Sequence, residues 1–225
     1  MDSNLRMRLA LLLEVSKQMQ QEGLVVGPGG NTSLKDEEGI MWISPSGVPF
    51  SELTIDDFVP LNVASGKIIK SKLMPSSEVP LHLLIYKARP DVNCVIHAHP
   101  PFVISLSSIN IQLIPLFPDF VVYLGDFVPQ IPYVTPCTEE MGQLVAAQIK
   151  KAPSCILKNH GAVTVGTSIK EAYTRMQVLE AGAKILFQSK LLGEPYVLSK
   201  QECQAILNLD IEQYRKKLLR EAELK

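Results

Sequence analysis

Two histidines separated by one residue are the clearest chemical signal in this chain. His97 and His99 close the apolar run 94–98, whose composition predicts a buried strand. Side chains two apart on a strand point to the same face, so the two imidazoles project together. Paired neutral imidazoles suit a borderline-soft divalent cation, although a bare His-x-His pair is equally consistent with two hydrogen-bonded polar residues at a strand end.

Two further residues could complete such a site. His160 follows a second apolar run, 154–157, in the turn Asn159-His160-Gly161, and strand ends are where ligands collect in α/β sheets. Glu78 follows Ser76-Ser77 at the start of an expected helix, where the dipole stabilises a carboxylate. Taken alone, His160 reads as a structural histidine and Glu78 as an ordinary helix-start glutamate. His82, one turn beyond Glu78, either packs inside the fold or supports the glutamate, and packing is the favoured interpretation.

Three short segments offer backbone amides and hydroxyls without a charged side chain. They are Gly29-Gly30-Asn31-Thr32-Ser33, Ser44-Pro45-Ser46-Gly47 and Pro75-Ser76-Ser77-Glu78. The last places two serines at a helix N-terminus, which is a natural anion site. The glycine loop matches neither the P-loop nor the dinucleotide fingerprint, so neither nucleotide fold is supported. Each segment alone is an ordinary turn.

Hydrophobic periodicity and turn residues predict alternating helices and strands around these motifs. Helices are expected over 5–22 (ended by Gly23), 78–88, 138–150 (capped by Thr138) and 168–192, with two shorter ones after it; strands are expected at 40–43, 58–61, 67–69, 94–98, 154–157 and 162–165, with short proline-punctuated strands over 119–136. No repeat or linker interrupts this order. The sequence therefore predicts a single α/β domain over residues 1–225, with helices on both faces of a mixed, largely antiparallel sheet.

Composition narrows the class of protein. The chain of 225 residues is 46% hydrophobic and 20% charged with a formal net charge of -1, as in ordinary globular proteins. The longest basic cluster, Arg215-Lys216-Lys217, reads as a solvated helix face, so we expect no nucleic-acid partner. The longest uncharged stretch, 94–118, is broken by four prolines and two histidines, so no membrane span is expected. Cys94 and Cys155 fall in apolar runs and are expected to be reduced core thiols of a cytoplasmic protein.

Taken in order, five of these motifs resemble the class II aldolase/adducin family over about residues 5–192. They are Gly30-Asn31-Thr32-Ser33, Ser44-Pro45-Ser46-Gly47, Pro75-Ser76-Ser77-Glu78, His97-Ala98-His99-Pro100 and Asn159-His160-Gly161. The resemblance implies a three-layer α/β/α sandwich, usually a cyclic homotetramer with active sites between subunits. It also implies metal ligands at His97, His99 and His160, holding zinc or another divalent ion such as Mn²⁺ or Co²⁺. Glu78 is implied as the acid/base that also binds the metal when substrate is absent.

The resemblance further implies a small phosphorylated sugar as substrate. Its phosphate would lie among Gly30, Asn31, Ser46, Gly47, Ser76 and Ser77. The implied reaction is cleavage of a ketose 1-phosphate, such as L-fuculose 1-phosphate or a related deoxy-ketose phosphate, to dihydroxyacetone phosphate and an aldehyde. Alternatives within the family are dehydratase, decarboxylase or 4-epimerase chemistry. A non-catalytic adducin-like interaction domain is a remote alternative, because such domains lack the histidine set that this chain retains.

One catalytic position departs from the aldolase pattern. Glu78 argues against the epimerase branch, which carries aspartate there. The tyrosine that aldolases of the family lend across the subunit interface has no counterpart, and Asp119 aligns in its place. Epimerases use an aspartate in this region, so Asp119 is a candidate catalytic residue, although a loop cap explains it equally well. Tyr123 or Tyr214 could supply a different proton donor.

Overall fold

Strand β4, Cys94–Ala98, lies at the centre of a seven-stranded sheet in the computed structural model, which describes residues 2–221. The strand order is β3-β2-β1-β4-β7-β6-β5, and every pairing is antiparallel except the parallel β5–β6 pair. The other strands are β1 (Asn31–Lys35), β2 (Ile40–Ile43), β3 (Val59–Asn62), β5 (Gln130–Ile131), β6 (Ser154–Leu157) and β7 (Gly161–Gly166). The expected mixed, largely antiparallel sheet is confirmed.

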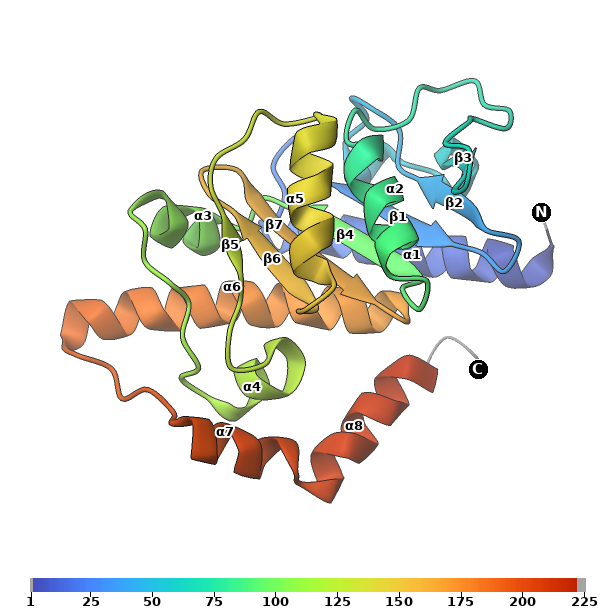
Figure 1. Ribbon diagram of the computed structural model, residues 1–225. Helices are drawn as coiled ribbons and strands as arrows, with labels where there is room; N and C mark the ends of the chain where they lie inside the picture. Colours follow the sequence, from blue (N-terminus) through green and yellow to red (C-terminus); the bar gives the residue numbers. More distant parts are fainter. Residues whose placement is uncertain (1, 222–225) are drawn as a thin grey trace.

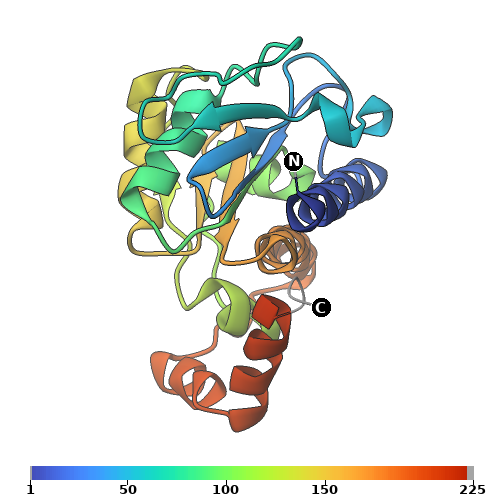
Figure 2. The same cartoon turned by 90° about the vertical axis from the view of Figure 1, so that its right-hand side faces the viewer.

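Helices cover both faces of this sheet (Figures 1 and 2). α2 (Val79–Ala88) and α5 (Glu139–Ile149) pack side by side on one face, while α1 (Ser3–Gln21), α3 (Pro101–Ser108) and α6 (Ile169–Leu192) lie on the other. The remaining helices are α4 (Pro118–Leu124), α7 (Lys200–Leu207) and α8 (Asp210–Glu221), with short 3-10 turns η1 (Phe50–Glu52) and η2 (Ile55–Asp57) between β2 and β3. The fold is thus a three-layer α/β/α sandwich.

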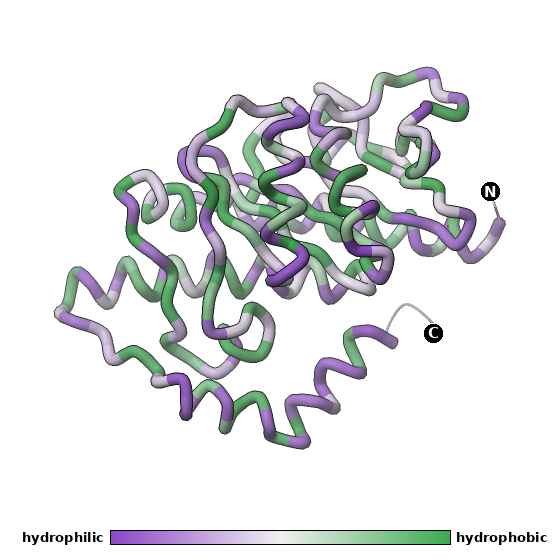
Figure 3. Tube along the Cα trace, in the orientation of Figure 1, coloured by the Kyte–Doolittle hydropathy of each residue, from purple (hydrophilic) through white to green (hydrophobic). Residues whose placement is uncertain are grey.

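Side chains of the central strand β4 pack into two hydrophobic cores. Along β4, Val95 packs in the core beneath α2 and α5, whereas Cys94 and Ile96 pack in the core beneath α1 and α6. This alternation follows from the two-residue period of a strand. Because both faces are covered, every residue of the strand is buried and all but His97 are apolar. Figure 3 shows hydrophobic residues along the central strands but few on α8. A rigid, doubly packed strand therefore carries the two closely spaced histidines.

Two strand predictions were wrong. Residues 67–69 form no strand and contribute only an isolated bridge between Leu61 and Ile68. Ile68 and Ile69 remain exposed, so no packing supports a further ladder. Residues 118–124 form helix α4 rather than a strand, because Pro118 presets the first helical turn and α4 packs against α6 and α7.

Two elements were not predicted at all. Strand β1 begins inside the glycine-rich loop segment, and helix α3 follows directly after the His97-Ala98-His99 motif. Glu180 of α6 accepts hydrogen bonds from the backbone N–H groups of Phe102 and Val103 at 2.9 and 3.0 Å, which fixes the start of α3. The other helices and strands that were predicted with bounds agree with the structure to within two residues, and α7 and α8 correspond to the two shorter helices predicted without bounds.

Other expectations from composition can be compared with the structure. All four cysteines are free thiols, and Cys94 and Cys155 are buried as expected. Within residues 2–221, no helix is long and apolar enough to cross a membrane.

Candidate metal centre

Three imidazoles converge where β4 ends. One ring nitrogen from each of His97, His99 and His160 lies within 4.8 Å of the others, and the Nε2 atoms of His97 and His99 are 3.1 Å apart. His97 and its neighbour come from β4 and the residue just after it, whereas His160 comes from the turn joining β6 to β7. The antiparallel pairing of β4 with β7, which sets Ala98 opposite Ala162, brings the two segments together. The structure therefore gathers all three predicted histidines.

Two glycines permit this close approach. A Cβ atom on Gly161 would collide with the carbonyl oxygen of Ala98 and lie 2.9 Å from the His99 ring. Gly30 has φ +67°, and a Cβ there would lie 2.9 Å from the His97 carbonyl oxygen. Larger residues at either position would push the histidine-bearing strand away from its neighbours.

One histidine ring is oriented by a backbone hydrogen bond, and the other two are neutral. His97 Nδ1 donates to the Ala162 carbonyl oxygen at 3.0 Å, which leaves the lone pair of its Nε2 facing the other rings. Burial, followed by the proximity of His97, lowers the pKa of His99 and of His160 to about 4. Both rings are therefore neutral near pH 7, the form in which imidazole binds a metal.

Glu78 places a buried carboxylate against the same rings. It is the N-cap of α2 and is 5% exposed. Its Oε2 accepts a hydrogen bond from Asn31 Nδ2 at 2.8 Å and lies 3.1 Å from His97 Nε2, while Oε1 lies 3.5 Å from His160 Nε2. Burial alone raises the pKa of Glu78, but His97, Asn31 and His160 outweigh it and the net pKa is lowered. The carboxylate is consequently ionised at neutral pH.

The cluster leaves polar atoms without partners. Among residues 2–221, the buried side-chain atoms that lack any hydrogen bond are Glu78 Oε1, His160 Nδ1 and Ser154 Oγ. Buried polar atoms are nearly always paired, so two such atoms in one cluster fit a site that binds a ligand. Three imidazoles and a carboxylate form a donor set that suits a zinc-like divalent cation.

A pocket of about 210 Å³ opens beside these side chains. Glu78, His99 and His160 line it together with every residue predicted for phosphate, namely Gly30, Asn31, Ser46, Gly47, Ser76 and Ser77. Backbone hydrogen bonds join the two serine-containing loops, from Ser46 N to Met74 O at 3.0 Å and from Ser76 N to Ser44 O at 3.1 Å. The pocket therefore combines a cluster of side chains that can bind a cation with a neutral cradle of hydroxyls and amides that suits an anion.

The candidate residue Asp119 does not reach this pocket within one chain. It lies in the first turn of α4, its side chain is 48% exposed, and it forms an ion pair with Arg215 at 3.5 Å. Tyr123 and Tyr214 do not line the pocket either. Any role for these three side chains would require contact with the pocket of another subunit.

Pro136 and Cys137 are neighbouring pocket residues that were not predicted from the sequence. Cys137 lines the rim, adopts the left-handed region at φ 67°, and donates from Sγ to Ser77 Oγ at 3.1 Å. Its place before the helix cap Thr138 marks a turn, but no sequence signal indicates that this turn folds over the serine pair.

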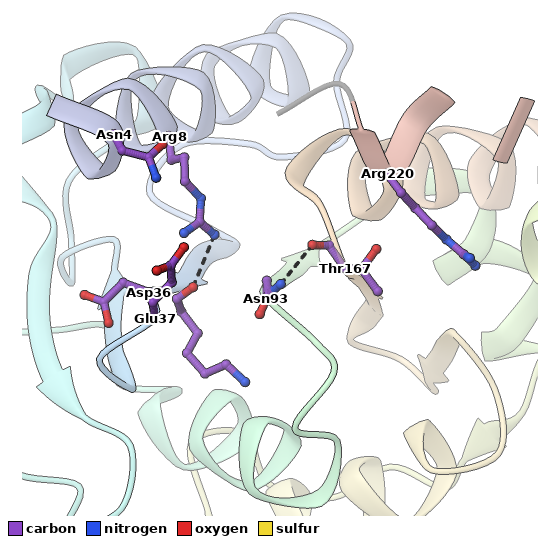
Figure 4. Close-up of a pocket in the computed structure, with 8 residues that line it drawn as sticks. Asn4, Arg8, Asp36, Glu37, Asn93, Thr167 and Arg220 are labelled. Atoms are coloured by element: carbon purple, nitrogen blue, oxygen red, sulfur yellow. Dashed lines mark hydrogen bonds between the residues drawn. The ribbon is translucent and has the colours of Figure 1, made fainter. Parts of the chain in front are cut away.

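A second polar pocket, of about 280 Å³, lies at the opposite end of the β1–β4 pair (Figure 4). Its lining side chains include Arg8, Lys35, Asn93 and Arg220. Arg8 donates to the Lys35 carbonyl oxygen at 3.2 Å and Asn93 donates to the Thr167 carbonyl oxygen at 3.1 Å, both drawn in Figure 4. This pocket contains none of the four histidines.

Comparison with known proteins adds independent information. Residues 10–187 match the family model described as the class II aldolase and adducin N-terminal domain. The chain is 32% identical over 194 residues to a 5-deoxy-D-ribulose 1-phosphate aldolase of Bacillus thuringiensis serovar kurstaki, covering 86% of this chain and 90% of that protein. It is 35% identical over 182 residues to an L-fuculose phosphate aldolase of Methanococcus vannielii, covering 80% of this chain and 95% of that protein.

The same likeness holds in three dimensions. A solved structure of an L-fuculose 1-phosphate aldolase superposes with a TM-score of 0.85 at 28% sequence identity. The superposition covers 96% of this chain and 98% of that one.

Proposed function

Because the chain belongs to the class II aldolase and adducin family and is an aldolase-type lyase, we propose that it cleaves a ketose 1-phosphate to dihydroxyacetone phosphate and an aldehyde, using a divalent cation. The observation that carries this proposal is the cluster of three imidazoles and one ionised carboxylate beside a neutral anion cradle. We propose further that residues 1–225 act as one domain.

The cation would be held by His97, His99 and His160, with Glu78 as an additional ligand in the absence of substrate. Zinc is our first choice, with Mn²⁺ and Co²⁺ as alternatives. Bound there, a divalent cation supplies Lewis-acid stabilisation of negative charge on substrate oxygens. The hydrogen bond from His97 Nδ1 to Ala162 would hold one ligand ring in its binding tautomer.

Glu78 would move the proton. Breaking the carbon–carbon bond leaves its electron pair on the dihydroxyacetone phosphate fragment, and that carbon must receive a proton before the product leaves. Oε1 of Glu78, which makes no hydrogen bond, is a buried carboxylate atom in the pocket that is free to carry it. Oε2 is already held by Asn31 Nδ2, so only one carboxylate oxygen is offered to substrate.

The phosphate would lie in the cradle of Gly30, Asn31, Ser46, Gly47, Ser76 and Ser77. Remote binding of the phosphate holds the reacting carbons at the carboxylate and can thereby support the reaction step. The side-chain amide of Asn31 is engaged with Glu78 and His82, so its second N–H and its backbone are what remain for phosphate.

We propose a homotetramer with sites between subunits. Support comes from the position of Asp119, Tyr123 and Tyr214, none of which lines the pocket of its own chain. The group that takes the proton from the hydroxyl that becomes the aldehyde oxygen would then come from a neighbouring subunit.

The test is a panel of ketose and aldose phosphates incubated with purified protein and coupled to detection of dihydroxyacetone phosphate. L-fuculose 1-phosphate and 5-deoxy-D-ribulose 1-phosphate belong in the panel because the relatives are named for them. We expect release of dihydroxyacetone phosphate that stops with a chelator and returns with a divalent ion.

Other outcomes point elsewhere. Loss of water or carbon dioxide, or a change of configuration without cleavage, would indicate dehydratase, decarboxylase or epimerase chemistry. Protein that binds no cation and transforms no sugar phosphate would favour an adducin-like interaction domain.

A further inference from the structure

A row of buried polar side chains runs from Glu78 into the core. Asn31 Nδ2 contacts Glu78 Oε2 at 2.8 Å, and Asn31 Oδ1 contacts His82 Nε2 at 2.5 Å. His82 Nδ1 contacts Ser33 Oγ at 2.7 Å, and Ser33 Oγ contacts Tyr86 Oη at 2.8 Å. All five residues are 5% exposed or less. The row is therefore shielded from water along its whole length.

The row arises from the periodicities of two elements. Asn31 and Ser33 are two apart on β1 and so share one face of the sheet. Glu78, His82 and Tyr86 recur every four residues from the N-cap of α2, which places them on one helix face. Packing α2 on β1 interleaves the two sets.

With a neutral His82 ring, only one arrangement of protons satisfies every contact while offering an N–H to the carboxylate. The ionised Glu78 can only accept, so Asn31 must present its NH₂ group to it and its oxygen to His82. That oxygen also can only accept, so His82 Nε2 carries the proton and Nδ1 accepts from the Ser33 hydroxyl. The Ser33 oxygen then accepts from Tyr86. Reversing the Asn31 amide would set two acceptor oxygens against each other in a dry site.

We propose that His82 is a positioning residue of the active site: by donating from Nε2 it fixes the amide of Asn31, which in turn holds Glu78 Oε2 and leaves Oε1 free for the substrate. This inference rests on the proposed function of Glu78. His82 itself belongs neither to the pocket lining nor to the cluster of three imidazoles. Complete burial lowers the pKa of His82 to about 3, so the ring remains neutral, as the row requires.

The first experiment reads the tautomer in cation-free wild-type protein by ¹⁵N NMR of the histidine rings. We expect His82 to be neutral with the proton on Nε2, and we expect the Asn31 side-chain amide protons to exchange slowly with solvent. A proton on Nδ1, or a charged ring, would overturn the proposal. This measurement does not depend on catalysis, so its result can be interpreted whether or not the protein shows the proposed aldolase activity.

The second experiment compares His82→Leu with His82→Gln. Leucine removes both polar atoms, and we expect kcat to fall about 10- to 100-fold, as for other partners that orient a reacting group. KM should stay within about twofold, because the phosphate cradle is untouched, and cation content should stay unchanged. Glutamine carries an N–H near the position of Nε2, and we expect it to restore most of kcat.

The matched control is Ile85→Val, a buried position on α2 outside the row. It should leave kcat unchanged, which separates positioning from general loosening of the helix. Wild-type kcat in His82→Leu, or equal losses in His82→Leu and His82→Gln with both folded, would refute the proposal. If the leucine variant does not fold, the glutamine variant and the tautomer measurement still decide it.

Discussion

Strands β1 and β4 carry polar residues at both of their ends. At one end lie Asn31, His97 and the carboxylate of Glu78; at the other lie Lys35 and Asn93. At the Lys35 end, side chains donate to backbone carbonyl groups: Lys35 Nζ to Pro90 at 2.7 Å and Asn93 Nδ2 to Thr167 at 3.1 Å. At the histidine end, Glu78 Oε1 has no hydrogen-bond partner.

The size of a pocket does not distinguish the two ends, because the Lys35 end holds the larger one, about 280 against 210 Å³. What differs is hydrogen-bond satisfaction. Polar groups that are paired with the chain's own backbone stabilise the fold, whereas buried donors and acceptors left unpaired are held ready for a ligand. The four predictions that follow test this contrast.

The largest effect is expected from His97→Ala. It removes one of three imidazoles, so bound cation should fall from about one per chain to near zero. Activity should fall about 10³-fold or more, because several kcal/mol of charge stabilisation are lost. Metal analysis and initial rates measure both. Asn93→Ala, just before the other end of β4, should retain cation and rate; a cation-loaded His97→Ala would break the comparison.

A smaller loss is expected from Glu78→Gln. The substitution keeps the shape but removes the group that carries the proton, so turnover should drop about 10²- to 10³-fold while the three histidines still bind the cation. Glu37→Gln, in the pocket at the Lys35 end, is the matched control and should be indistinguishable from wild type. Near-normal turnover in Glu78→Gln would remove Glu78 from its proposed role.

Acid should lower the free energy of unfolding of the cation-free protein, because the buried histidines bind protons less readily in the folded state. The pKa values of His99 and His160 are lowered to about 4, and that of His82 to about 3, from an ordinary value of 6.5. At a pH between the lowered pKa values and 6.5, the unfolded chain binds more protons than the folded one. The contribution of these histidines to stability therefore falls as the pH drops below 6.5 and is constant above it. After discounting the partly exposed His99 and His160, we expect a loss of roughly 3 kcal/mol from pH 7 to 5.

Urea titrations of chelated protein measure this loss. The lowered pKa of Glu78 acts in the same direction as the pH approaches its ordinary value, since its contribution is lost as the carboxylate is protonated. An unfolding midpoint that does not change from pH 7 to 5 would contradict the burial of neutral imidazoles.

The smallest effect is expected in the stability of Asn93→Ala. Loss of its hydrogen bond to the Thr167 carbonyl group should cost about 1 kcal/mol, with no change in rate. Chemical denaturation measures the first and the coupled assay the second. A large change in rate would show that the Lys35 end also serves the reaction.

Much of the site could be predicted because its signals are local. The two-residue period of β4 placed His97 and His99 on one face, and serines before Glu78 marked a helix start. The convergence of His160 with them depends on the β4–β7 pairing, which no local pattern encodes; only the family resemblance supplied it. The resemblance also grouped the two serine-containing loops, 44–47 and 75–78, as parts of one phosphate site. The backbone hydrogen bond from Ser46 to Met74 shows how these loops are held together.

The errors fall where tertiary contacts override local preference. Val121 and Val122 favour a strand, yet packing of α4 on α6 makes them helical. The glycines before Asn31 suggested a loop, but pairing with β4 extends the following residues into β1. The role of His82 was also open, because a histidine that packs and one that positions a neighbour look alike until its partners are known.

The pairing of β7 with β4 also determines when the chain can first capture its cation. His97 and His99 are synthesised together, but the third ring of the proposed ligand set belongs to the hairpin between β6 and β7. A nascent chain on the ribosome therefore carries an incomplete site until that hairpin has emerged and joined the sheet. Cation binding by a nascent chain would therefore indicate that β7 has paired with β4. Measuring bound cation on a series of stalled chains of increasing length would show at which chain length this pairing occurs.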